Sequence, residues 1–173
     1  MNRMLTFYCK RRGEEYTQGL HELCAPFVWL YRSSSEDEED DEATAFNVFY
    51  AFVTNFLPTM FSGEDFNLLN ASLRFFELLL QYHDPRLSNL LQQYGLRSQL
   101  YATSWFVTLF APTLPLTHIF DVWDMYIIEG SPFVHHFASL ALLQSTSHTL
   151  MAAEAETDGR VQISRDLLME QLM

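Results

Sequence analysis

The chain has 173 residues, 49% of them apolar, which is enough to build one globular domain around a sizeable core. The 10 basic residues stand against 22 acidic ones, and the formal charge of -12 argues against nucleic acid or an anionic membrane surface as partner. Cys9 and Cys24 form no C-x-x-C pattern, so the composition indicates no disulfide framework and favours a reducing compartment.

The amino-terminal residues are not expected to form a signal peptide, because Lys10, Arg11 and Arg12 interrupt the short apolar stretch before them. Two later uncharged stretches, residues 43–63 and 98–117, reach membrane-spanning length. Asparagines and a proline interrupt the first stretch, and two prolines interrupt the second. Both are expected to be buried helices.

Residues 33–42 are serines followed by an acidic run that begins at Glu36. Like charges at this density repel one another and resist burial. The segment is therefore predicted to be a flexible acidic surface loop between two helices, within the domain. A role in binding a basic partner is the alternative.

The rest of the chain repeats apolar residues every three or four positions, which predicts helices. The periodic stretches are residues 46–60, 66–80, 116–127 and 133–143. No stretch shows the period of two that is typical of strands. The fold class is predicted to be all-α, a single domain of about eight helices.

Capping residues mark several expected helix ends. Asp84-Pro85 and Ser131-Pro132 each combine a capping side chain with a proline that suits the first helical position. Gly95 suits the end of the helix that begins at Pro85. Two further candidate caps are Ser62 and Ser164.

The usual signatures of enzyme active sites are missing from the sequence. It contains no G-x-x-x-x-G-K-[ST], G-x-G-x-x-G or G-x-S-x-G motif. His21 lacks the second histidine of H-E-x-x-H, and adjacent His135 and His136 point to different helix faces. His83 would need more ligands to hold a metal, and Asp84 is better explained as a cap. We expect no metal site and no cofactor of the chain's own.

One segment differs from these helices. It contains Tyr16-Thr17-Gln18-Gly19, followed by Leu23 and Ala25-Pro26. This run resembles the Y-x-Q-G motif of TBC domains, which activate GTP hydrolysis by Rab-type small GTPases.

Downstream residues continue the resemblance in the family's order. They are Trp105-Phe106, Leu109-Phe110, Pro115, Trp123-Asp124 and Gly130, followed by the helix expected at 133–143. The series is similar to W-F-x-x-L-F, P, hydrophobic-x-W-D and G in TBC domains, and it implies their all-α fold. The stretch Tyr82-His83-Asp84-Pro85 looks like the divergent branch that includes the kinase-like TBC protein and its Golgi-associated relatives.

The resemblance implies that Gln18 is a catalytic residue acting in trans. Its amide both accepts and donates hydrogen bonds, so beside the γ-phosphate of the partner it can hold the attacking water. Tyr16, Thr17 and Gly19 are then expected to bind the partner. GTP and Mg would be carried by that GTPase, so the chain is expected to be an activator rather than an enzyme with its own turnover.

The family's arginine finger lies in an I-x-x-D-x-x-R motif before Y-x-Q-G, and this chain has no match for it. Arg3, Arg11 and Arg12 lie outside that motif, and Arg11 and Arg12 are instead candidates for binding an acidic GTPase surface. Such an arginine contributes on the order of 10³ to 10⁵ in rate, so Gln18 alone is expected to stimulate weakly. We expect residues 1–173 to be a TBC domain that is incomplete at its amino terminus.

Three interpretations remain open. The chain is a Rab GTPase-activating domain of vesicle traffic that uses an upstream arginine, or a catalytically impaired TBC scaffold that binds a GTPase or a trafficking adaptor. The third interpretation is an unrelated helical adaptor with a chance motif. The first two imply a cytoplasmic protein without a transmembrane segment, recruited peripherally to Golgi or endosomal membranes.

Two tryptophans and one acid in these motifs have structural interpretations. Trp105 and Trp123 lie on apolar helical stripes and are expected in the core. Asp124 can cap a helix, pair with a basic residue or orient the motif segment, and the sequence does not choose among these.

Overall fold

The computed structural model describes residues 1–31, 38–57, 67–131, 133–147 and 151. Within these ranges the secondary structure is entirely helical, which confirms the predicted all-α class. The helices are α1 (Asn2–Arg12), α2 (Leu20–Tyr31), α3 (Glu38–Phe56), α4 (Asn67–His83), α5 (Pro85–Gln93), α6 (Ser98–Tyr101), α7 (Thr103–Thr108), α8 (Leu116–Glu129) and α9 (Val134–Ser145).

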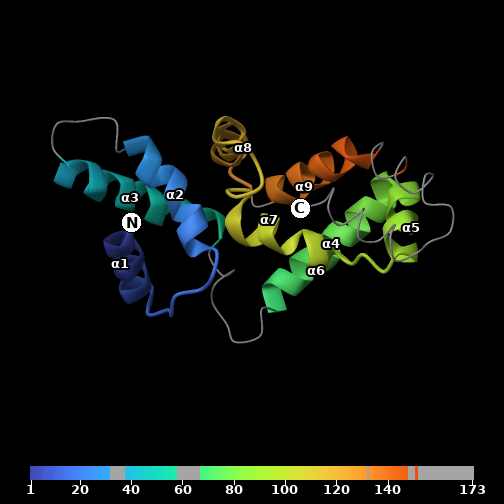
Figure 1. The fold of residues 1–173 in the computed structure, drawn as a ribbon, viewed down its shortest axis with the longest axis horizontal. Helices are drawn as coiled ribbons and strands as arrows, with labels where there is room; N and C mark the ends of the chain where they lie inside the picture. The colour runs from blue at the N-terminus through green and yellow to red at the C-terminus, as the bar shows by residue number, and fades with distance from the viewer. Residues whose placement is uncertain (32–37, 58–66, 132, 148–150, 152–173) are drawn as a thin grey trace.

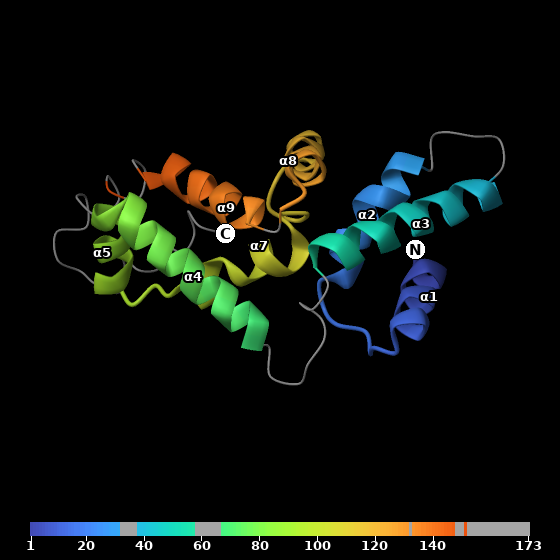
Figure 2. The same cartoon turned by 180° about the vertical axis from the view of Figure 1, so that it is seen from behind.

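The helices form an elongated molecule with a helical group at each end. Figure 1 shows α1, α2 and α3 together at one end and α4 and α5 at the other, with α7 between them. Figure 2 shows the same arrangement from behind. The motif segment between α1 and α2 therefore lies in the first group.

Within the described residues, the buried apolar side chains form two adjoining clusters, whereas the composition suggests one core. The N-terminal core joins α1, α2 and α3 to α8, and the C-terminal core joins α4, α5, α6, α7 and α9. Leu109 belongs to the N-terminal core and Phe110 to the C-terminal core, while Leu114 and Val122 pack against both. The end of α7 is thus the place where the two cores meet.

Helices of the C-terminal core follow the sequence pattern closely. The predicted stripe of α4 is buried at Leu69, Leu73, Phe76 and Leu80. At the start of α5 the carboxylate of Asp84 accepts a hydrogen bond from the backbone N–H of Leu87 at 3.0 Å. That bond satisfies one of the free N–H groups of the first turn, as a helix cap should.

The end of α5 also matches its prediction. Gly95 has a φ of 66°, and its N–H donates to the carbonyl of Gln92 at 3.0 Å. A left-handed φ is the conformation in which glycine commonly closes a helix.

Ser131 does not cap a helix in the predicted way, because α9 begins later, at Val134. The Ser131 hydroxyl still accepts a hydrogen bond from the N–H of Phe133 at 3.3 Å.

Two predicted segments are placed differently in the structure. Helix α3 begins at Glu38, so the second half of the predicted acidic loop over 33–42 is helical. Negative residues at the start of a helix interact favourably with its dipole, which explains why the acidic run can begin one. Residues 32–37, like the candidate caps Ser62 and Ser164, lie outside the described ranges.

The uncharged stretch 98–117 is predicted to be a buried helix. In the structure it is divided into the short helices α6 and α7 and a turn that leads to α8. Leu109 and Phe110 have φ values of 49° and 67°, which end α7. The indole N–H of Trp123 donates to the carbonyl of Leu109 at 2.9 Å in a buried bond. Burial of both side chains and this bond hold a left-handed conformation that non-glycine residues otherwise avoid.

Candidate functional site

The motif residues form the turn that connects α1 to α2. Gly13 ends α1 with a φ of 67°, and α2 begins at Leu20. The N–H of Leu20 donates to the carbonyl of Thr17 at 3.2 Å, and the N–H of Leu23 donates to the carbonyl of Gly19 at 3.0 Å. These bonds join the turn directly to the first turn of α2.

Gln18 lies at the exposed corner of this turn. Among the described residues, its side-chain amide makes no hydrogen bond. The amide carries both a donor and an acceptor, and both are open to a partner molecule. The catalytic role of Gln18 stays a prediction.

Gly19 holds the turn against α7. Its φ is 100°, and a Cβ at this position would lie 3.0 Å from Cγ1 of Val107 and 3.2 Å from Cγ2 of Thr108. The close approach that requires glycine is therefore made within this chain. Contact of Gly19 with a partner remains a prediction, but its buried position shows that it also fixes the turn in place.

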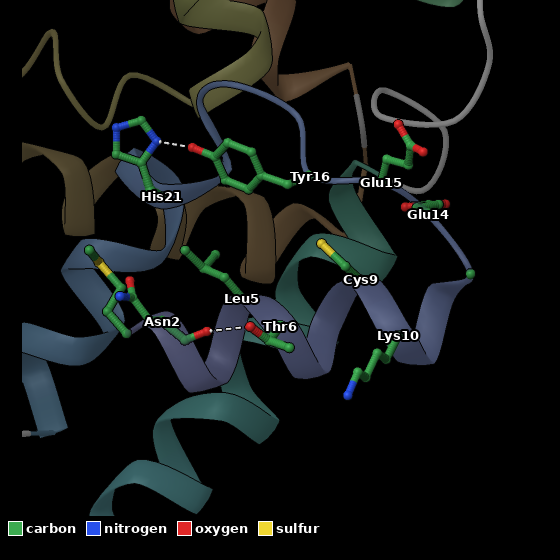
Figure 3. A pocket seen from close by; sticks show the side chains of 11 residues that line it. Asn2, Leu5, Thr6, Cys9, Lys10, Glu14, Glu15, Tyr16 and His21 are labelled. Atoms are coloured by element: carbon green, nitrogen blue, oxygen red, sulfur yellow. Dashed lines mark hydrogen bonds between the residues drawn. The ribbon is translucent and has the colours of Figure 1, made fainter.

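Tyr16 is tied to the first turn of α2. Its hydroxyl lies 2.6 Å from Nδ1 of His21, and the two rings are 6.3 Å apart between centroids. Figure 3 shows the hydroxyl directed at the imidazole ring, with a dashed line between them. The tyrosine ring is 54% exposed, so one face is open to solvent while its hydroxyl is engaged.

A broad groove of about 1220 Å³ opens beside this pair. Its walls are one face of α1 and the chain from Gly13 to Tyr16, and Lys10 and Glu15 lie on its rim (Figure 3). Burial and the carboxylate of Glu14 raise the pKa of the Cys9 thiol. Because a thiol with a raised pKa stays protonated, Cys9 is poorly suited to act as a nucleophile here.

The arginines near the motif have partners within the chain. Arg12 forms an ion pair with Glu14 at 3.1 Å, and Arg3 forms one with Glu42 at 3.5 Å. The guanidinium of Arg11 lies 4.5 Å from the ring centre of Tyr50. Arg11 and Arg12 are thus each in contact with another group of the free chain, and their role in binding a partner stays a prediction.

No group of three or more potential metal-ligating side chains occurs within the described residues. The adjacent histidines are in the core rather than on the surface, and His135 bonds the hydroxyl of Tyr126 at 2.6 Å. Trp105 and Trp123 are each 3% exposed, which confirms their predicted packing role. Asp124 is exposed, and in the described part of the chain it has no hydrogen bond or ion pair.

A sequence model of the Rab-GTPase-TBC domain matches residues 1–151. This chain belongs to the Rab-GTPase-TBC domain family. The resemblance carried by Tyr16-Thr17-Gln18-Gly19 and by the tryptophan motifs is thereby confirmed. No described helix of this TBC domain has the length and hydropathy needed to cross a membrane.

Relatives of the TBC domain include two curated proteins. It is 34% identical over 137 residues to the TBC domain-containing protein kinase-like protein of Homo sapiens, across 79% of this chain and 14% of that protein. It is 33% identical over 135 residues to the GTPase-activating protein GYP5 of Eremothecium gossypii, across 76% of this chain and 15% of that protein. The chain thus spans a small part of the relatives it matches.

A solved structure confirms the fold. The Ypt/Rab-GAP domain of Gyp1p matches with a TM-score of 0.72 and 21% identity, over 98% of this chain and 62% of that one. The kinase-like relative agrees with the branch indicated by Tyr82-His83-Asp84-Pro85.

His21 is the residue that sequence reasoning placed in no functional role. Sequence inspection tests it as a zinc ligand, and that test says nothing about Tyr16. The two residues are five positions apart across a turn, so no helical spacing rule predicts that they meet. The sequence signal that could have indicated this contact is a histidine, His21, that follows soon after the motif tyrosine.

Proposed function

We propose that this TBC domain stimulates GTP hydrolysis by a Rab-type small GTPase and supplies Gln18 in trans. The observation that carries the proposal is the exposed amide of Gln18, which makes no hydrogen bond within the described chain and extends from a turn packed against α7. Membership of the Rab-GTPase-TBC family supports the class of partner. The GTPase-activating name of the GYP5 relative supports the direction of the effect.

The chemistry follows from what a small GTPase lacks. Its attacking water is poorly oriented, and charge that develops on the phosphates is incompletely stabilised. The carbonyl oxygen of Gln18 can accept from the water while its amide N–H donates to an oxygen of the reacting phosphate. GTP and Mg²⁺ belong to the partner, so this chain needs to hold only Gln18 in place.

Tyr16, Thr17 and Gly19 surround Gln18 and would lie at the contact with the GTPase. The proposed cellular role is control of vesicle traffic by a cytoplasmic protein that is recruited to Golgi or endosomal membranes. Trafficking adaptors are further proposed partners of the same domain.

A second candidate function is that of a scaffold that binds a GTPase without accelerating hydrolysis. The observation that favours it is the engagement of nearby arginines, since Arg3 and Arg12 are in ion pairs and Arg11 lies over Tyr50. Without an arginine beside the phosphates, the rate gain of roughly 10³ to 10⁵ that such a residue provides is missing.

Single-turnover GTP hydrolysis across a panel of Rab proteins separates the two functions. We expect stimulation by this chain and its loss in Gln18→Ala, with GTP-dependent binding retained. Gln81→Ala is the matched control, because Gln81 is an exposed glutamine on α4, away from the motif turn. A version lengthened at the amino terminus to include an I-x-x-D-x-x-R motif is expected to stimulate more strongly. Binding without stimulation by any version would favour the scaffold.

A further inference from the structure

The turn that carries Gln18 is held from one side by buried groups. Leu20 is 1% exposed and belongs to the N-terminal core, and Gly19 touches Val107 and Thr108 of α7. These contacts fix the turn where it enters α2. The other side, where the chain arrives from α1, is exposed at Glu15 and Tyr16.

One bond closes that exposed side. The hydroxyl of Tyr16 lies 2.6 Å from Nδ1 of His21, a short hydrogen bond between residues that flank the turn on either side of Gln18. The bond links Tyr16 to α2, whose start is anchored by Leu20. Gln18 thus lies in a loop of the backbone, from Tyr16 to His21, whose two ends are joined by a side-chain hydrogen bond.

The carboxylate of Glu22 favours one tautomer of His21. Nε2 of His21 lies 3.8 Å from a carboxylate oxygen of Glu22. A lone pair on Nε2 would face this negative charge unfavourably, so the neutral ring is expected to carry its proton on Nε2. Nδ1 is then the acceptor, and the hydroxyl of Tyr16 donates to it. The three side chains form a line from Tyr16 through His21 to Glu22.

We propose that His21 is a positioning residue for Gln18 and acts through its hydrogen bond to Tyr16. The inference rests on the proposed function, in which Gln18 reaches the GTPase. It gives the hydroxyl of Tyr16 a role of its own, besides the proposed contact of the tyrosine ring with the GTPase, because the hydroxyl is already engaged in the free domain. Loss of the bond frees one end of the turn while the Gly19 contacts with α7 remain. Gln18 then samples more orientations, fewer of which meet the attacking water.

Kinetics give the first test, with the whole 173-residue chain and a Rab that it stimulates. In His21→Ala and in Tyr16→Phe we expect the maximal single-turnover rate to fall roughly 3- to 10-fold, as loss of one hydrogen bond would produce. The half-saturating concentration of the domain should stay nearly unchanged, because binding contacts remain. The double variant should fall no further than either single one, since both remove the same bond.

Conservative and matched variants make the test specific. Asn at position 21 places an amide oxygen close to where Nδ1 stood, so His21→Asn should recover most of the rate. Tyr82→Phe and His83→Ala are the controls, because these residues are an exposed tyrosine and histidine with rings 5.1 Å apart, away from the motif. Both controls should leave the rate unchanged. Equal losses in the controls, or additive losses in the double variant, would overturn the proposal.

Backbone order gives a second test that does not depend on activity. We expect NMR order parameters of the Thr17, Gln18 and Gly19 amides to be near about 0.8 in the parent chain. In His21→Ala and Tyr16→Phe they should fall toward about 0.6, while Tyr82→Phe retains the parent values. Unchanged order in both variants would overturn the positioning role. If no Rab is stimulated by the parent chain, the proposed function fails, and the order parameters still decide the inference.

Discussion

The two cores of this TBC domain are built from different chemistry. Within the described residues, the N-terminal core buries apolar and aromatic side chains, with Trp123 stacked on Phe27 at 5.0 Å and close to Phe52 at 4.8 Å. The buried polar residues all lie in or beside the C-terminal group of helices. They are Ser88, Ser98, Thr108, His135, His136 and Ser139.

The difference separates two ways of holding a helical fold together. Packing of rings depends on volume and is insensitive to pH, whereas buried polar groups need hydrogen-bond partners and buried histidines also respond to protonation. The motif turn is attached to the first kind of core through Leu20 and meets the other group of helices at Gly19. The motif turn therefore draws on both groups of helices, with the start of α2 in the aromatic N-terminal core.

Removal of Trp123 should lower the free energy of unfolding more than the substitutions that follow, because Trp123 lies in the aromatic N-terminal core. Trp123→Ala takes away a 3% exposed ring that stacks on Phe27 and bonds the carbonyl of Leu109. Loss of such a buried ring costs about 3 to 5 kcal/mol of unfolding free energy. Urea denaturation followed by circular dichroism measures it.

Two further variants separate packing from hydrogen bonding at this site. Trp123→Phe retains a ring but leaves the buried carbonyl of Leu109 without its donor, which should cost about 1 to 3 kcal/mol. Trp29→Ala is the control, because Trp29 is 59% exposed and should change stability by less than about 1 kcal/mol. Similar effects at Trp29 and Trp123 would contradict the packing account.

Gly19→Ala tests the junction between the two groups of helices. An Ala at φ 100° is strained, and its Cβ would lie 3.0 Å from Val107 Cγ1, so we expect a loss of about 2 to 3 kcal/mol. Gly13→Ala is the matched control, since Gly13 also has a positive φ of 67° but nothing within 4 Å of a Cβ. It should lose only about 1 kcal/mol. Equal losses would show that the contact with α7 contributes nothing.

Sequence reasoning succeeds where a local pattern and the tertiary structure agree. Helix α4 buries the predicted stripe, and Asp84 and Gly95 act at the ends of α5 as their residue types suggest. It fails at α1, whose weak periodicity hides the burial of Met4, Leu5 and Tyr8. It also fails at the end of α7, where Leu109 is left-handed because of a bond from α8.

The candidate site shows the same limit. The residue types of Tyr16-Thr17-Gln18-Gly19 are enough to identify the motif, and Gln18 is exposed in the structure. The bond from Tyr16 to His21 and the contact of Gly19 with α7 depend on how a turn folds back. Such contacts are tertiary, so no periodicity in one sequence predicts them.

A change of pH should affect the C-terminal group through His135. Burial, with a smaller effect from neighbouring His136, lowers the pKa of His135 from its ordinary 6.5 to about 3. The unfolded chain therefore takes up this proton first, and stability present above about pH 6.5 is lost as the pH falls toward 3. Between about pH 7.5 and pH 5 this one group should cost about 2 kcal/mol.

His135→Phe isolates that contribution. The variant lacks the titrating ring and the bond to Tyr126, so it should be less stable at pH 7.5 but should lose about 2 kcal/mol less on acidification. Urea unfolding of both proteins at the two pH values gives the comparison, because the other five histidines are the same in both chains. An identical pH dependence would show that His135 takes up its proton in the folded state.

The smallest expected effect comes from the cap of α5. Asp84→Ala removes the acceptor for the N–H of Leu87 at the start of the helix, which should cost about 1 kcal/mol. Asp124→Ala is the matched control, as Asp124 is an exposed acid on α8 with no hydrogen bond or ion pair among the described residues. Its loss should lie within about 0.5 kcal/mol of zero. Asp84 acts on one helix end, whereas Trp123 packs against α2 and α3. A loss of stability at Asp84 as large as that at Trp123 would therefore contradict the difference proposed between a local cap and a core residue.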